Sequence, residues 1–298
     1  MRDSPIPSRV TFRTNGGSPG IVRITICWSI IGLTLAAAGL AAQSPLAAGV
    51  TVGSAKLTDQ RSEQALSGVL QFQANPWLSL SAVPSFVHVR DIVKGSAVSS
   101  NGIGDLPLSA AAVHAFPAAG APTIAAALTI VLPTGNAACG LGSGATSEGL
   151  DIGLATSPNP KLHLSVDASR SISHVSSQST LSAPRATSLL LGAGYDVAPD
   201  WRGAVSLGID VGQSDSTQRL SRVAGAGVSR RLGGSLALTA DASIGLTSGS
   251  PKWVLSLGLG SVFAGTSPVG LSAPLRRLKS GFSGGVNRQS GAGKIGCR

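Results

Sequence analysis

The sequence predicts an all-β fold, a transmembrane antiparallel up-and-down β-barrel of about 12 strands. Long segments alternate apolar and polar side chains with period 2, and short turns alternate with longer polar segments. The chain is 43% hydrophobic but only 12% charged, whereas soluble domains have about 25% charged residues. No internal run of about 20 apolar residues could cross a bilayer as a helix. A barrel places apolar side chains in lipid while each strand stays half polar.

Twelve alternating segments are expected to form the wall. They lie at about 47–55, 66–73, 77–90, four within 102–172, and then 189–197, 201–211, 219–231, 235–246 and 253–263. Pro84 removes a ladder donor from the third strand, so a bulge or irregular edge is expected there. The alternative is a soluble β-sandwich or β-solenoid. It would show short strands and a charged outer face, and neither is present.

The stretch from Gly102 to Ile172 shows the alternation most clearly, with two long loops and two short turns. From Leu162 to Ile172, the apolar residues fall on one face and the polar residues, including His163 and Asp167, fall on the other. Strands of this length, about ten residues, suit a tilted membrane-spanning strand.

Three short motifs occur in order in this stretch: G-I-G-D at 102–105, L-P-T-G at 132–135 and G-L-G-S-G at 140–144. Together they resemble the outer-membrane β-barrel family named after the meta-pathway of phenol degradation. The matching residues are Gly102, Gly104, Asp105, Pro133, Thr134 and Gly135. The resemblance fades before Gly102 and in the C-terminal tail. It implies passage of small, often hydrophobic or aromatic compounds across the outer membrane of a Gram-negative bacterium.

The two ends of the chain differ from the rest in charge. Of the formal net charge of +10, residues 1–42 contribute +3 and residues 265–298 contribute +6, so the 222 residues between them carry +1. Residues 1–42 are expected to be a signal peptide, with an uncleaved anchor helix as the alternative. Residues 43–264 would form the barrel, and 265–298 a basic, disordered tail. No nucleic-acid partner is expected, because neither end interleaves its basic residues with a folded aromatic platform.

Loop lengths predict the orientation of the barrel. Turns near 75, 118, 158, 199 and 233 are short and would face the periplasm, whereas 91–102, 133–146 and 174–184 would face outward. The aromatic residues Trp77, Phe116, Tyr195, Trp201 and Phe263 would form one interfacial belt. The Gly-rich loop is expected to be flexible and external, with Cys139 accessible from outside. Cys27, Cys139 and Cys297 are expected to form no disulfide framework.

The polar face of the strands would line the lumen. Its charged positions are Asp105, His163, Asp167, Arg202, Asp210 and Asp241. They would either set the ionic preference of a passage or form a mutually paired barrel interior. His163 with Ser165 and His174 with Ser176 place a histidine and a serine on one face, but serine is common here and such pairs occur by chance.

We therefore expect no enzymatic activity, cofactor or metal site. No cysteine and histidine spacing matches a zinc site, and no Lys-Ser/Thr follows the Gly-rich loop as in a phosphate-binding loop. The predicted function is passive passage of small, possibly hydrophobic or aromatic compounds, with outer-membrane lipid and an unidentified solute as partners. The alternative is a non-transporting outer-membrane surface or structural protein that acts through its outer loops.

Overall fold

The chain forms a closed antiparallel β-barrel of twelve strands in a computed structural model that describes residues 45–172, 187–211 and 221–263. The described strand segments are β1 (Leu46–Lys56), β2 (Arg61–Asn75), β3 (Leu78–Ala82), β4 (Ser85–Val93), β5 (Ser96–Ile103), β6 (Leu106–Ala115), β7 (Thr123–Leu132), β8 (Ser147–Asn159), β9 (Leu162–Ile172), β10 (Thr187–Ala198), β11 (Trp201–Val211), β12 (Arg222–Gly233), β13 (Leu236–Gly245) and β14 (Trp253–Gly260). Two three-residue 3₁₀ turns, η1 (Ala137–Cys139) and η2 (Ser261–Phe263), complete them.

Two of the twelve wall strands are interrupted, which accounts for the fourteen segments. β3 and β4 both pair with β2 and form one wall strand that breaks at Val83 and Pro84. β5 and β6 form the next wall strand, which breaks at Gly104 and Asp105. Around the first break, the Val83 N–H donates to the Pro107 carbonyl at 3.0 Å. The all-β barrel, its twelve strands and the irregularity at Pro84 are therefore confirmed.

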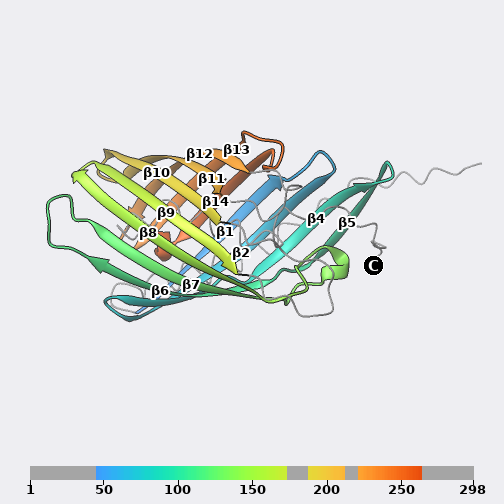
Figure 1. Ribbon diagram of the computed structural model, residues 1–298, viewed down its shortest axis with the longest axis horizontal. Coiled ribbons are helices and arrows are strands. Elements are labelled where there is room, and N and C mark those ends of the chain that lie inside the picture. The colour runs from blue at the N-terminus through green and yellow to red at the C-terminus, as the bar shows by residue number, and fades with distance from the viewer. Residues whose placement is uncertain (1–44, 173–186, 212–220, 264–298) are drawn as a thin grey trace, which may run out of the picture.

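The barrel closes between the first and last strands. β1 pairs with β2 on one side and with β14 on the other, in a register that runs from Gly49 opposite Gly260 to Lys56 opposite Trp253. Figure 1 shows β1 and β14 meeting among strands that run obliquely around the tube. No helix among the described residues is long and apolar enough to cross a membrane.

The two ends of the barrel differ in their connections. The turns after β2, β6, β8, β10 and β12 all lie at one end, called here the short-turn end. Strands β7, β9, β11 and β13 run toward the other end, called the long-loop end, where each of them stops. Hairpin β4–β5 also ends there and projects beyond its neighbours (Figure 1).

This hairpin corrects the prediction of a long external loop at 91–102. The strands continue to Val93 and resume at Ser96, joined only by Lys94 and Gly95. Both turn residues have positive φ, 50° and 80°, as a two-residue hairpin turn requires. The sequence signal was weak because Lys-Gly is not one of the Asn-Gly or Asp-Gly pairs that favour this turn.

The alternation along each strand divides the wall into an outer apolar face and an inner face of small and polar residues. Large apolar side chains are exposed on the outside, among them Val52, Phe86, Leu128, Ile152, Val205 and Leu257. Residues one position away along the same strands are often buried and polar, as at Ser67, Ser165, Thr239 and Ser256. Such an outer surface matches hydrocarbon rather than water.

Four of the five aromatic residues predicted to form a belt lie exposed at the short-turn end. Trp77, Phe116, Tyr195 and Trp201 are exposed there, as an interfacial belt requires. Phe263 corrects the prediction, because its ring lies against Gly49 and Gly258 on the inner face of the barrel. Turn η2 directs it inward, and the Ala48 N–H donates to Ser261 Oγ at 3.0 Å.

Several predictions fall outside the described residues. They concern the signal peptide, the basic tail, the 174–184 loop and the pair His174 and Ser176.

Candidate functional site

The interior of the barrel is the candidate site, and the strand register places the predicted charged residues on its inner face. Asp167 lies opposite Gly153, Asp210 opposite Ser188, and Asp241 opposite Gly227. His163 and Arg202 lie on the same face near the short-turn end, whereas Asp105 lies in the break between β5 and β6. Of the six, the structure brings only His163 and Arg202 together.

Two of these carboxylates lie along the wall rather than projecting into the lumen. A Cβ at Gly153 would collide with Oδ1 of Asp167, and a Cβ at Gly227 would collide with Oδ1 of Asp241. The missing side chain of each glycine therefore makes room for the carboxylate on the neighbouring strand. Asp167 is only 1% exposed, so its negative charge lies close to the wall.

Asp105 holds the β7–β8 connection, residues 133–146, inside the barrel. Its Oδ1 accepts the Gly135 N–H at 3.0 Å, and its Oδ2 accepts the Ser143 N–H at 2.6 Å. The side chain is 3% exposed, and hydrogen bonds to a buried carboxylate are among the stronger ones in proteins. Asp105 therefore ties the two ends of this loop to the break between β5 and β6.

The remaining motif residues complete the same docking site. Thr134 Oγ1 donates to the Gly104 carbonyl at 2.8 Å. A Cβ at Gly102 would lie 2.7 Å from Leu141 Cδ1, and one at Gly135 would lie 2.5 Å from the Leu141 carbonyl oxygen. Glycine is needed at Gly135 because a Cβ there would meet the backbone of the loop, whereas at Gly102 only the end of the Leu141 side chain would have to move. The motifs G-x-G-D and L-P-T-G thus form two sides of one contact.

Arg61 holds the tip of the loop from β2. Its Nη2 donates to the Gly140 carbonyl at 3.0 Å. The guanidinium also pairs with Glu63 at 2.5 Å and with Asp91 at 3.2 Å. Glu63 is fully buried, and a buried carboxylate needs such a partner. The loop is consequently held at its base by Asp105 and at its tip by Arg61.

Apolar packing reinforces these polar contacts. Cys139 and Leu141 of the loop are 6% and 3% exposed and pack in one cluster with wall residues. Those wall residues are Ala55, Ala65, Val87 and Val89, all on the inner faces of β1, β2 and β4.

The position of the loop overturns two predictions. The Gly-rich loop is not a flexible external loop, and Cys139 is not exposed at the surface. Cys139 is also disulfide-bonded, which corrects the expectation that the cysteines form no disulfide framework.

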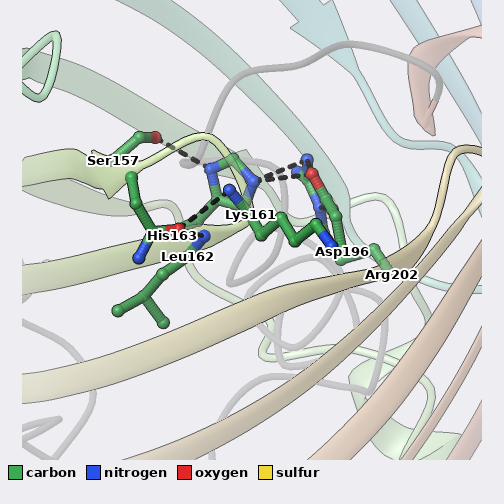
Figure 2. A network of polar contacts seen from close by, with 7 residues as sticks. Ser157, Lys161, Leu162, His163, Asp196 and Arg202 are labelled. Atoms are coloured by element: carbon green, nitrogen blue, oxygen red, sulfur yellow. Dashed lines mark hydrogen bonds and ion pairs between the residues drawn. The ribbon is translucent and has the colours of Figure 1, made fainter.

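A second polar cluster lies near the short-turn end and joins four neighbouring strands. Figure 2 shows the His163 ring between Ser157 on one side and Asp196 with Arg202 on the other. Nδ1 of His163 lies 2.8 Å from Ser157 Oγ, and Nε2 lies 2.9 Å from Asp196 Oδ2. Arg202 donates to both oxygens of Asp196, at 2.5 and 3.0 Å. The cluster crosses β8, β9, β10 and β11.

Nε2 of His163 faces both Nη2 of Arg202 and Oδ2 of Asp196, each at 2.9 Å. A guanidinium can only donate and a carboxylate can only accept, so Nε2 serves one of them at a time. With its proton on Nδ1, the neutral ring donates to Ser157 and accepts from Arg202; with its proton on Nε2, it donates to Asp196 and accepts from Ser157. In both forms the ring links the polar side chains of four neighbouring strands. Ser165, the predicted neighbour of His163, instead lies against Gly192. Among the described residues, no group of three potential ligands could hold a metal ion.

Replacing Arg202 by glutamine should destabilise the barrel. Asp196 would lose its charged partner, and hydrogen bonds to charged groups contribute about 1.5–3 kcal/mol each. A lowered midpoint in a urea unfolding titration of the lipid-reconstituted protein would show this. The matched control is Arg230→Gln, which removes a guanidinium 5.1 Å from the ring of Trp201. At an exposed site that contact contributes only about 0.5–1 kcal/mol. Equal midpoints for the two variants would contradict the prediction.

Comparison with known families identifies the chain. The sequence profile of the family described as "Putative MetA-pathway of phenol degradation" matches residues 40–263. The chain belongs to this family. The match extends on the N-terminal side of Gly102, where the resemblance of the motifs had faded. The family residues from Gly102 to Gly135 are those that dock the internal loop.

Solved structures share the fold of the chain. The COG4313 outer membrane channel from Pseudomonas putida F1 is 18% identical, with a TM-score of 0.60 over 73% of this chain and 95% of that chain. The KdgM porin is 10% identical, with a TM-score of 0.49 over 71% of this chain and 97% of that chain. No curated protein matches. At 18% identity, the likeness to the first of these structures shows the barrel fold alone.

Sequence reasoning missed several residues of the interior: Arg61, Glu63, Asp91, Ser157 and Asp196. One signal was available for the first two, because Arg61 and Glu63 are two positions apart on one strand and so share a face. The same alternation places Asp196 on the face of Gly192 and Gly194. Ser157 had no such signal, since it lies at the strand end beside the turn.

Proposed function

We propose that the chain is a passive channel for small solutes in the outer membrane of a Gram-negative bacterium. Its apolar outer wall suits lipid, and its inner face carries small and polar side chains that suit a passage. The observation that carries the proposal is the loop 133–146, held within the barrel by Asp105 and Arg61. An internal loop that occupies part of the lumen is expected in a passage that limits the size of its solutes.

The inner face has an excess of acidic residues, which would favour cations over anions. In the described residues, the acids on the inner face are Glu63, Asp91, Asp105, Asp151, Asp167, Asp196, Asp210 and Asp241. The arginines on the same face are Arg61, Arg202 and Arg231. Arg61 pairs with Glu63 and Asp91, and Arg202 pairs with Asp196.

Replacing Asp210 and Asp241 by asparagine should shift the permeability ratio toward anions, because both lie on the inner face and neither has an arginine partner in the described residues. The ratio follows from the reversal potential across a planar bilayer with a salt gradient. Leu128→Val is the control, since Leu128 is exposed on the outer face. If the permeability ratio is unchanged in the double variant, these two acids do not contact the permeating ions.

The solute class we propose is small and uncharged, with an aromatic ring. The family description names phenol degradation, and the internal loop adds apolar surface from Leu141 beside Val87 and Val89. Uptake of radiolabelled phenol into liposomes that contain the protein tests this, with a sugar of similar size as the comparison. Equal uptake rates for phenol and the sugar would show that the channel has no preference for aromatic solutes.

A non-transporting surface role remains the second candidate, and hairpin β4–β5 favours it because it projects beyond the barrel (Figure 1). Conductance separates the two candidates. A refolded protein without measurable conductance in a planar bilayer would favour the surface role.

A further inference from the structure

The outer face of the barrel carries a shallow groove that the channel function does not use. Its volume is about 1020 Å³. It crosses the outward faces of six neighbouring strands, in the order β12, β13, β14, β1, β2 and β4. Side chains that line it include Val52, Leu66, Phe86, Val228, Leu255 and Leu257, with a floor of small residues at Gly53, Ala226, Gly227, Ala240 and Ala242.

Three successive rows of outward residues lie at one end of the groove, on β1, β2, β4 and β5; the first two rows contribute lining residues and the third lies just beyond them. The strand register aligns them across the wall. The first row is apolar: Val52, Leu66, Phe86 and Ile103. The second is polar: Ser54, Gln64, His88 and Asn101. The third is basic and hydroxylic: Lys56, Ser62, Arg90 and Ser99. Each row lies about 6.6 Å further along the strands toward the long-loop end.

The groove runs obliquely through the height of the wall. At one end, Val228 lies in the middle of β12, five residues from the short turn that begins at Gly233. At the other end, His88 lies far from the short turn after β2 and close to the tip of hairpin β4–β5. The apolar part of the groove thus extends along the lipid-facing surface from the middle of the wall toward the long-loop end. The polar and basic rows begin there.

The two cations of the basic row are available for a ligand. Elsewhere in the described residues, Arg61 pairs with Glu63 and Asp91, and Lys252 lies 3.5 Å from Asp59. Lys56 and Arg90 make no ion pair or side-chain hydrogen bond in the structure. They lie two strands apart, which corresponds to about 10 Å at the usual strand spacing. A pair of free cations above an apolar groove complements an anionic amphiphile.

We propose that this groove binds an acylated, phosphate-bearing lipid of the outer leaflet. An acyl chain lies along the apolar floor between Val228 and Phe86. The polar head contacts Gln64 and His88, and its phosphates pair with Lys56 and Arg90. The proposal rests on the outer-membrane location given under the proposed function and on the long-loop end facing outward, which together place the basic row at the outer surface.

A second copy of the chain fits this surface less well. Two copies that met at the groove in a symmetric dimer would bring the same patch of each against the other. Lys56 and Arg90 of one copy would then approach the same cations of its partner, and like charges in contact are unfavourable. A phosphate lipid instead neutralises both cations.

Native mass spectrometry of the full chain in detergent tests the proposal, with purified lipid A as the probe. We expect a one-to-one adduct that survives detergent removal, and roughly ten-fold weaker binding in the double variant Lys56→Ala with Arg90→Ala. Ala240→Phe should also weaken binding, because its ring fills the floor of the groove. Ala126→Phe is the matched control, since Ala126 lies on the outward face of β7, away from the groove.

The outcomes separate this proposal from the channel function, because lipid binding is measured without any transport. Binding that is equal in wild type and in both groove variants would overturn the proposal. Equal binding of phosphatidylethanolamine, which has one phosphate and a compensating ammonium, would overturn the role of the two cations. A dimer that Ala240→Phe dissociates would assign the groove to a second copy. Loss of conductance with lipid binding intact would refute only the channel.

Discussion

Replacing Asp105 by alanine should raise the single-channel conductance of the reconstituted barrel several-fold. The carboxylate accepts the N–H groups of Gly135 and Ser143, and both hydrogen bonds are lost in the variant. Each hydrogen bond to a charged group contributes about 1.5–3 kcal/mol. Their loss would therefore lower the equilibrium constant for docking of the loop by more than ~10²-fold. An undocked loop leaves a wider passage. Planar-bilayer recordings would measure the change.

Two further variants locate the effect in the loop. Arg61→Ala should also raise the conductance, because it removes the hydrogen bond to the Gly140 carbonyl. Asp210→Asn should leave the size of the conductance nearly unchanged, since Asp210 lies opposite Ser188 and makes no contact with the loop. Conductance that is identical in wild type and Asp105→Ala would show that the narrowest point lies elsewhere in the barrel.

Replacing Leu207 by arginine should destabilise the barrel by about 2–4 kcal/mol, the cost of a cation at the mid-plane of a lipid-facing wall. Leu207 lies opposite Leu191 and Ala224, on the outward face of β11. The measurement is a urea titration of folding into lipid vesicles.

The neighbouring position provides the control for this change. Ser206 lies on the inner face between Gly192 and Gly225, so an arginine there faces the polar interior and not lipid. Ser206→Arg should therefore be mild. Equal losses of stability for the two variants would mean that the register of β11 is reversed.

The wall of the barrel was predictable from the sequence because its signal is local. An apolar and polar alternation fixes the face of each residue without knowledge of its partner strand. This alternation alone places Asp167, Arg202 and Asp241 on the inner face. The break at Pro84 was equally local, since a proline cannot donate to the ladder.

The internal loop was not predictable, because its contacts join residues far apart in the sequence. Glycine-rich segments have no periodicity that indicates what they pack against. Only the docked structure shows why Gly102 and Gly135 lack side chains and why Asp105 follows Gly104. The resemblance to the family marked these residues without giving their role.

Phe263 and the tip of hairpin β4–β5 were missed for a different reason. In both cases, a short turn decides where the chain goes after a strand ends. Lys94 and Gly95 reverse the chain within two residues, and η2 turns Phe263 toward Gly49. Turn geometry of this kind depends on positive φ angles and on single contacts, which a pattern of apolar residues does not contain.

The docked loop also bears on the order in which the barrel can assemble. Its hydrogen bonds and its buried apolar neighbours come from residues 55–105, and the half-buried Val254 of β14 packs against the same cluster. An open sheet that ends at β8 already contains all of these contacts except that of Val254. Closure instead needs Gly49 to meet Gly260, a pairing across most of the chain with the larger loop-closure entropy. The loop can therefore bind while the seam is still open, and so pre-curve the first half of the sheet before the last strand arrives.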